Sequence, residues 1–326
     1  MANNRDGLVQ HMRQWLGRQG IDANATLIAG VSGGLDSMVL AETLHRVGIS
    51  FHVAHVNYHL RGAASDADQA LVEGWCAERG VPYDVLHAQV DSTEHGVQAE
   101  ARKIRYGHFE RLRTEASDRQ GRPAYIVTAH HGDDQAETVL LHLMRSADPL
   151  ALAAMPAVDA ERWLLRPFLT LTRTELAEAC STWNVAYRED ASNAKPDYLR
   201  NRIRHEALPL FDSLRPGTTA HVAHWADRFQ SLRSFFTTER DAATARCWKM
   251  SDGKGELDLS VWRAEPLRVE ILHGLAHEHG IAARAVPELL HLTEAQVESG
   301  AHFVCATVRI ERRGNALHWT SLTCAA

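Results

Sequence analysis

The sequence predicts an α/β fold in which a doubly wound parallel sheet is joined to a second, smaller and mainly helical domain. The first observation is that apolar, β-rich runs alternate with stretches of helical spacing through the first part of the chain. Repeated strand–helix–strand units favour a parallel sheet with helices on both faces. The second observation is the length of 326 residues, which exceeds the size of most single hydrophobic cores. We therefore expect two domains, at residues 1–216 and 217–326.

The elements of the first domain follow from the spacing of apolar residues, which differs between strands and helices. We expect strands at residues 26–31, 51–56, 82–86 and 124–129, and helices at residues 37–47, 65–79 and 97–114. Thr172 and Glu175 have the spacing of a capping box and predict the start of a further helix. The crossover rule makes the parallel connections right-handed.

The second domain is expected to begin after Arg215-Pro216-Gly217, where turn residues interrupt the helical pattern. Helical spacing resumes at residues 218–248 and returns at residues 286–298, where Pro287 is tolerated in the first turn. Residues 303–319 predict a β-hairpin, because Gly314-Asn315 supplies a turn near the end of this stretch.

The composition is that of an ordinary soluble globular protein, with 45% hydrophobic and 23% charged residues. The N-terminus lacks the basic and apolar regions of a signal peptide, and no apolar run is long enough to span a membrane, so a cytoplasmic protein is expected. Five cysteines without a Cys-x-x-Cys spacing indicate neither a disulfide framework nor a zinc ribbon. The formal net charge of -6 argues against indiscriminate nucleic-acid coating but allows a local basic face.

The most informative stretch, Ser32-Gly33-Gly34-Leu35-Asp36-Ser37, joins the first predicted strand to the first predicted helix. Ligands of doubly wound sheets bind beyond the carboxyl ends of the strands. The glycines permit positive φ and the close approach of an anion, and the helix N-terminus offers unpaired N–H groups. The stretch has no Gly-Lys-Ser/Thr and no third glycine at dinucleotide spacing, so it matches neither of those phosphate motifs.

An isolated Ser-Gly-Gly sequence can also be interpreted as a tight turn that binds no ligand. Asp36 favours the phosphate hypothesis, because a carboxylate beside a phosphate is repulsive unless a divalent cation lies between them. Asp36 is therefore the predicted Mg²⁺ contact.

This stretch resembles the pyrophosphate-loop (PP-loop) signature of the ATP pyrophosphatases, which split ATP into AMP and pyrophosphate while adenylating an oxygen of their substrate. Further stretches resemble one family among them, the bacterial tRNA(Ile)-lysidine synthetases. They are residues 54–61, 100–106, 128–138, Arg166-Pro167, 189–193 and 198–204. The resemblance runs in the same order from about residue 24 to residue 212. The chain ends before the last domain of longer members, which implies the short form.

The resemblance implies a reaction and a set of partners. Members of the family adenylate the C2 oxygen of the wobble cytidine in the CAU anticodon of tRNA(Ile), and the ε-amine of free lysine then displaces AMP. ATP, Mg²⁺, tRNA(Ile) and lysine are therefore the expected ligands, no membrane is involved, and a homodimer is one option for the assembly. The implied ATP-binding residues are Ser32, Gly33, Gly34, Leu35, Asp36, Ser37 and His55.

The block around His130-His131 is the implied lysine site, with His130, Asp134 and Glu137 as its residues. Asp134 and Glu137 are three positions apart and share one helix face, and the ordinary histidine pKa, about 6.5, suits proton handling. Two simpler readings stay open. The histidines and Asp134 could bind a metal, although no third nitrogen or sulfur ligand is evident at zinc spacing. Alternatively, one of Asp133 and Asp134 is only a helix cap.

Basic residues form two clusters that the resemblance assigns to tRNA phosphates, although charged helix residues are often simply solvated. The implied tRNA contacts are Arg102, Arg105, Lys195, Arg202 and Arg204. Arg200 is a candidate to steady the ATP phosphates. With Asp36, His130, Asp134 and Glu137 it completes the expected catalytic set.

One segment departs from the family, whose members normally continue with Arg-Gly-Ser/Thr-Gly-x-x-Gly. Here Arg145 is followed by residues 146–152, Ser-Ala-Asp-Pro-Leu-Ala-Leu, so all three glycines are lost. We expect this loop to support the fold and to tolerate the change. Two other functions remain as alternatives: a tRNA-thiolating enzyme, which generally needs a cysteine pair that this chain lacks, and a non-catalytic tRNA-binding relative, which the intact polar motifs disfavour.

Overall fold

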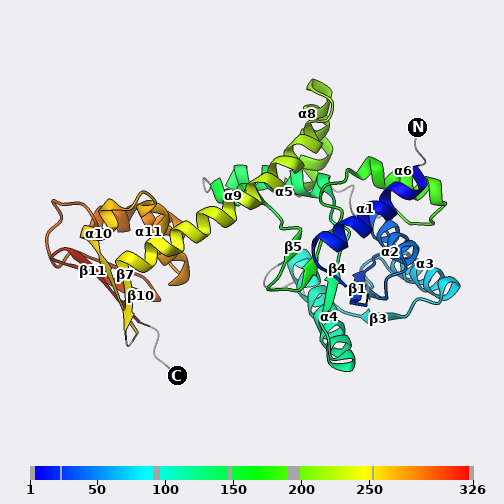
Figure 1. Cartoon of the computed structure of the whole chain (residues 1–326), viewed down its shortest axis with the longest axis horizontal. Coiled ribbons are helices and arrows are strands. Elements are labelled where there is room, and N and C mark those ends of the chain that lie inside the picture. The colour runs from blue at the N-terminus through cyan, green and yellow to red at the C-terminus, as the bar shows by residue number, and fades with distance from the viewer. Residues whose placement is uncertain are drawn as a thin grey trace. The chain divides into compact units, whose positions relative to one another are not determined.

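The computed structural model describes residues 4–22, 24–90, 96–145, 149–189, 199–251 and 253–322. The chain forms two compact units, Met1–Gln230 and Ser231–Ala326 (Figure 1). The division falls inside the long helix α9 (Thr218–Cys247), beyond the predicted break at residues 215–217. The first half of α9 belongs to the first unit because Ala223 and Ala226 are buried there.

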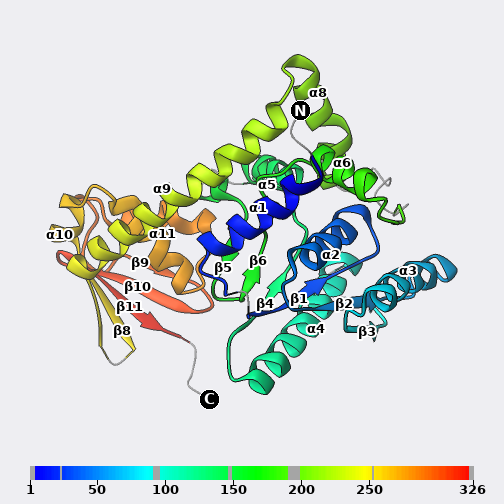
Figure 2. The same cartoon turned by 45° about the vertical axis from the view of Figure 1, so that its right-hand side comes forward.

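The first unit contains the predicted parallel sheet, in the strand order β3-β2-β1-β4-β6-β5 (Figure 2). All neighbouring strands are parallel except the edge strand β5, which is antiparallel to β6. The four strands expected from the sequence are confirmed as β1 to β4. The strands are β1 (Thr26–Gly30), β2 (Phe51–Asn57), β3 (Tyr83–His87), β4 (Ala124–Val127), β5 (Val158–Asp159) and β6 (Leu164–Leu165).

Helices cover both faces of this sheet because the central strand is apolar on both sides. Leu27 and Ala29 of β1 pack into the core formed with α1, α2 and α6, whereas Ile28 packs against Phe109 of α4 on the other face. The capping box of Thr172 is present and starts α6 as predicted. The long helices of this unit are α1 (Asn4–Arg18), α2 (Leu35–Val47), α3 (Ala63–Arg79), α4 (Val97–Gln120), α5 (Gly132–Arg145) and α6 (Arg173–Trp183).

A 3₁₀ turn (Pro149–Ala153) follows α5 and precedes β5. Three short helical segments precede α9: α7 (Leu199–Arg202), a π-helical turn (Ile203–Ala207) and α8 (Leu208–Leu214). None of the described helices combines the length and the apolar character needed to cross a bilayer.

The second unit combines helices, as expected, with more strands than the single hairpin that the sequence predicted. It contains a five-stranded antiparallel sheet in the order β7-β8-β11-β10-β9, whose apolar face packs on helices. The predicted hairpin is present, with Gly314-Asn315 as the turn between β10 and β11. The elements are β7 (Trp248–Ser251), β8 (Lys254–Asp258), α10 (Leu259–Ala264), α11 (Arg268–Glu278), a 3₁₀ turn (Ala283–Ala285), α12 (Val286–Leu292), β9 (His302–Val304), β10 (Val308–Arg313) and β11 (Ala316–Ser321).

The helix predicted at residues 286–298 ends early, at Leu292. The buried guanidinium of Arg312 donates hydrogen bonds to the carbonyl oxygens of Leu292 and Glu294, which satisfies backbone groups that a longer helix would have bonded internally. A side chain from the hairpin therefore sets the end of α12, and the local pattern could not reveal it.

Candidate active site

The candidate site lies where the strand order of the sheet reverses. From β1 the chain moves outward through β2 and β3, and it returns to pair β4 with the other side of β1. Crevices beyond the carboxyl ends of such strands are the usual ligand sites of doubly wound sheets. The segment that follows β1 contains the phosphate turn, Ser32–Ser37, and the segment that follows β4 contains the two adjacent histidines.

The phosphate turn is closed by hydrogen bonds among its own residues. The backbone N–H of Ser32 donates to Ser37 Oγ at 3.1 Å, and Ser37 Oγ donates to the carbonyl of Gly34 at 2.9 Å. Gly33 has φ +90°, which an L side chain rarely adopts. Gly34 is the N-cap of α2 and offers no side-chain cap, so the N–H groups of the first turn are left for a ligand.

Asp36 is suited to a magnesium ion. Its Oδ1 is buried without a hydrogen-bond partner among the described residues, and its Oδ2 lies 3.6 Å from His131 Nε2. Mg²⁺ commonly takes one or two carboxylates together with substrate phosphates. Among the described residues, no three histidine, cysteine or acidic side chains have an arrangement that could hold a metal ion by themselves. The donor set therefore fits a cation that shares Asp36 with a nucleotide.

The two adjacent histidines have opposite electrostatic surroundings. Burial lowers the pKa of His130 to about 4, and the guanidinium of Arg166 contributes to this decrease. Burial would also lower the pKa of His131, but the carboxylates of Asp134, Asp133 and Asp36 outweigh it and raise that pKa to about 10. At neutral pH His130 is a neutral base, with Thr128 Oγ1 at 2.8 Å from its Nδ1, whereas His131 is a cation. His130 was predicted as a site residue, whereas His131, which contacts three carboxylates, was not.

Asp134 and Glu137 share two arginines that arrive from much later in the chain. Arg204 donates through Nε to Glu137 at 2.5 Å and through Nη2 to Asp134 at 3.0 Å. Arg200 Nε donates to Glu137 at 2.8 Å. Four carboxylates, with Asp36 and Asp133 included, thus face two arginines and one histidine. Among these contacting side chains negative charge is in excess whichever protonation form His131 takes, while Arg166, Arg102 and Arg105 act on the neighbouring His130.

The start of α5 is fixed by neighbouring segments. Asp134 accepts a hydrogen bond from the backbone N–H of His131 at 3.1 Å, so it caps the helix while it also contacts the arginines. Asp133 accepts from the backbone N–H of Arg173 at 2.9 Å. Gly132 approaches Leu171 so closely that a Cβ would lie 2.9 Å from the Leu171 oxygen. The expected division into one cap and one functional aspartate is therefore too simple.

The remaining predicted residues take different positions. His55 is buried and donates from Nδ1 to the carbonyl of Val31 at 2.8 Å, which ties β2 to the start of the phosphate turn. Arg204 pairs with carboxylates of the site, although it was predicted as a tRNA contact. Arg202 is exposed and pairs with Glu206. Arg102 and Arg105 lie against the ring of Tyr106, and Lys195 is outside the described residues.

The described part of the altered loop and the residues that follow it are held against α5, where the His142 ring donates from Nδ1 to the carbonyl of Ala151. Gln135 donates to the carbonyl of Met155 at 2.8 Å and accepts from its backbone N–H at 3.0 Å. Ala154 adopts φ +48° without being a glycine. Residues 146–148, where two of the lost glycines would stand, lie outside the described residues.

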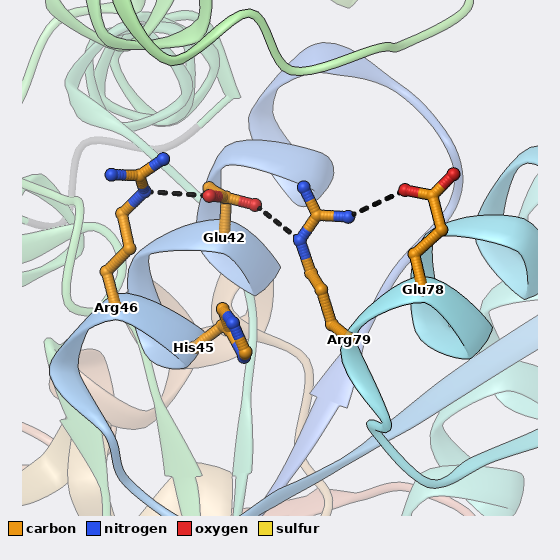
Figure 3. Close-up of a pocket in the computed structure, with 5 residues that line it drawn as sticks. All are labelled: Glu42, His45, Arg46, Glu78 and Arg79. Atoms are coloured by element: carbon orange, nitrogen blue, oxygen red, sulfur yellow. Dashed lines mark hydrogen bonds and ion pairs between the residues drawn. The ribbon is translucent and has the colours of Figure 1, made fainter.

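A surface hollow of about 550 Å³ lies elsewhere, at the C-terminal ends of α2 and α3 (Figure 3). Glu42 is buried there and accepts hydrogen bonds from Arg46 and Arg79, while Arg79 also pairs with Glu78. Helix C-terminal ends favour cations, so the two arginines suit this place without any ligand. The hollow is part of the fold's support and is not the candidate active site.

Comparison with known proteins agrees with this geometry. The PP-loop domain family matches residues 8–211. The tRNA(Ile)-lysidine synthase of Porphyromonas gingivalis is 30% identical over 302 residues, which cover 91% of this chain and 63% of that protein. The Bacillus subtilis protein of the same name is 39% identical over 201 residues, which cover 59% of this chain and 42% of that protein. The chain thus spans less than two thirds of the length of these relatives.

A solved structure supports the fold alone. The U34-tRNA thiolase NcsA from Methanococcus maripaludis superposes with a TM-score of 0.55 at 17% identity, covering 68% of this chain and 77% of that one. The family match extends over more than half of the sequence and includes both the phosphate turn and the histidine pair. On these grounds the chain belongs to the PP-loop domain family.

Proposed function

We propose that this protein is an ATP-dependent tRNA(Ile)-lysidine synthetase, which joins lysine to C2 of the wobble cytidine in a CAU anticodon. The observation that carries the proposal is that the phosphate turn and a carboxylate cluster with a neutral histidine meet at one edge of the sheet. The names of the curated relatives point the same way.

In the first step, the C2 oxygen of cytidine attacks the α-phosphate of ATP and pyrophosphate leaves. The backbone N–H groups of Gly34 and of the first turn of α2, together with the hydroxyls of Ser32 and Ser37, are suited to hold the nucleotide phosphates. Magnesium shared between Asp36 and the nucleotide would supply positive charge on the departing phosphates.

In the second step, the ε-amine of lysine attacks C2 and AMP leaves. Lysine arrives as an ammonium ion, and the excess of carboxylates around Asp134 and Glu137 is suited to bind it. The amine must lose a proton before it attacks. His130 is a neutral imidazole at physiological pH and can accept that proton.

The thiolation alternative finds little support among the described cysteines. Cys76, Cys180 and Cys247 are buried, and burial raises the pKa of the Cys76 thiol to about 12, which keeps it protonated and a poor nucleophile. Cys305 is only partly buried, and hydrogen bonds with Thr307 lower its pKa, but no second described cysteine accompanies it in the second unit except the buried Cys247. The chain also contains no Cys-x-x-Cys.

The test is incorporation of radiolabelled lysine into a tRNA(Ile) transcript with a CAU anticodon, in the presence of ATP and Mg²⁺. A matched transcript with U at the wobble position is the control. Label that requires ATP and the wobble cytidine supports the proposal. Pyrophosphate release without lysine label would refute lysidine synthesis and favour a different acceptor. The predicted homodimer can be checked separately by light scattering.

A further inference from the structure

The phosphate turn lacks a positive side chain of its own. From Val31 to Met38 the only charged residue is Asp36, which is negative. The pyrophosphate that leaves ATP carries several negative charges. In a nucleotide loop of the Gly-Lys-Ser/Thr type, the lysine of the loop contacts these phosphates and offsets their charge. A cation from another segment would serve the same purpose here.

Asp68, near the start of α3, holds two arginines beside this turn. Its Oδ1 accepts from Arg188 Nε at 2.8 Å, and its Oδ2 accepts from Arg61 Nη2 at 2.7 Å. The Asp68 side chain is largely buried, whereas the side chain of Arg188 is 45% exposed. Asp68 thus uses one oxygen for each of the two guanidinium groups.

The cluster touches the phosphate turn directly. The backbone N–H of Arg188 donates to the carbonyl of Gly33 at 3.0 Å. A Cβ built on Gly33 would lie 3.3 Å from the backbone oxygen of Asp68 and 3.4 Å from its Cβ. Arg188 and Asp68 therefore both contact Gly33 of the turn, although they are 120 positions apart in the sequence.

Arg188 has donors available for a ligand. Its Nε is used by Asp68, and the described part of the chain supplies no hydrogen-bond partner for its two terminal nitrogens. A guanidinium whose remaining N–H groups face an anion binds phosphate with directed, charge-assisted hydrogen bonds. The partly exposed position lets such a ligand reach it.

We propose that Arg188 binds the β- and γ-phosphates of ATP and the pyrophosphate that they become, and that Asp68 positions it. This inference rests on the proposed function only in requiring that the site binds ATP. In the adenylation step a bond forms between the substrate oxygen and the α-phosphorus, and the bond from that phosphorus to the bridging oxygen breaks. The electron pair leaves with pyrophosphate, and the guanidinium of Arg188 stabilises the negative charge that this leaving group gains.

The experiment measures equilibrium binding of Mg-ATP, Mg-pyrophosphate and AMP to the full chain by calorimetry. Arg188→Met keeps the length of the side chain and removes its charge. It is expected to weaken ATP and pyrophosphate binding by about 10-fold or more, the effect of losing a hydrogen bond to a charged group, and to leave AMP binding unchanged. Arg188→Lys is expected to recover part of the loss, because it restores the charge without the planar fork.

Arg79→Met is the matched control. Arg79 also donates through Nε to a buried carboxylate shared with a second arginine, at 3.0 Å, but it lies at the Glu42 hollow. This variant is expected to bind all three ligands as the wild type does. Asp68→Asn should weaken pyrophosphate binding less than Arg188→Met does, because it loosens Arg188 without removing it.

Three results would overturn the inference: unchanged pyrophosphate affinity in Arg188→Met, equal losses for pyrophosphate and AMP, or equal losses in Arg188→Met and Arg188→Lys. The last two would mean that Arg188 only braces the turn. A wild-type protein that binds no Mg-ATP would instead contradict the proposed function.

Discussion

Two buried glutamates of the first unit, Glu42 and Glu137, have nearly the same immediate partners. Each is almost fully buried, lies on a helix that follows a central strand, and accepts hydrogen bonds from two arginines. At Glu42 the indole N–H of Trp75 and the nearby Glu78 complete the pairing, so charges balance (Figure 3). At Glu137, Asp134 shares the same two arginines and also contacts His131, as Asp36 and Asp133 do, so the four carboxylates of this network outnumber its three cations.

The difference shows that burial and ion pairing do not by themselves mark a functional residue. Glu42 lies far along α2, near the helix end, whereas Glu137 lies in the second turn of α5, close to the carboxyl ends of the strands. The position relative to the sheet edge and the unbalanced charge separate a structural cluster from a binding cluster. Four predictions test this distinction.

The largest effect is expected for Glu137→Gln. Loss of this carboxylate removes part of the negative charge that would hold the lysine ammonium, and it misplaces Arg200 and Arg204. The rate of lysine incorporation should fall by roughly 10³-fold, within the range for loss of a catalytic polar group. Glu42→Gln, assayed as the folded fraction, should retain the wild-type rate. Equal rates of lysine incorporation in Glu137→Gln and Glu42→Gln would contradict the assignment of Glu137 to a binding cluster and of Glu42 to a structural one.

For stability, Glu42→Gln is expected to be costly. It leaves Arg46 without its counter-charge and Arg79 with only the exposed Glu78, and the free energy of unfolding should fall by about 3 kcal/mol, near the lower end for breaking a buried pair because both arginines reach solvent. Urea unfolding at pH 7 measures the change. Glu78→Gln, at a largely exposed partner of Arg79, should change stability by less than about 1 kcal/mol. Similar losses of unfolding free energy in Glu42→Gln and Glu78→Gln would mean that the burial of Glu42 does not increase its contribution to stability.

A pH effect is expected at the binding cluster, from His130. Its pKa is lowered to about 4 in the folded protein, so the unfolded chain binds a proton more readily between that pH and about 6.5. The stabilisation is complete above pH 6.5 and is lost as the pH falls, by roughly 3 kcal/mol in total. His130→Gln should remove this part of the acid sensitivity. Parallel curves of unfolding free energy against pH for the two proteins would contradict the assignment.

The smallest effect concerns the loop beside α5. Ala154 has φ +48°, a left-handed conformation that costs an alanine about 1 kcal/mol or more, partly offset by the flexibility of glycine when unfolded. Ala154→Gly should therefore raise the unfolding free energy by roughly 0.5 kcal/mol. Ala151→Gly, in the adjacent 3₁₀ turn, should lower it. The same sign for both would show that the backbone of Ala154 is not strained.

The sequence predicted the first unit well because its signals are local. Strands such as β1 are apolar on both faces, and a capping box or a glycine pair marks where helices start. The phosphate turn and the acidic residues of α5 could be located for the same reason. Strand β8 was missed because Leu257 is its only large apolar residue, and β7 was missed because it continues directly from α9.

What the sequence could not provide was the set of long-range partners. Arg204 belongs to a basic run that looks like a solvated face, and only the fold brings it to Asp134 and Glu137. His130 and His131 are adjacent and chemically identical, but burial and Arg166 lower the pKa of His130, whereas Asp134, Asp133 and Asp36 raise that of His131, and Arg166 and Asp36 come from other segments. The contact of Arg188 with Gly33 is of the same kind.

The separation along the chain between Glu137 and its arginines also has a consequence for biosynthesis. Arg200 and Arg204 follow Glu137 by 63 and 67 residues, so at about 5–20 residues per second the ribosome needs roughly 3–13 s to supply them. Until then α5 cannot bury its glutamate without leaving a charge unpaired. We expect nascent chains stalled before Arg200 to be cleaved by protease within α5, and chains extended past α8 to be protected there. The candidate site would thus be among the last parts of the first unit to form.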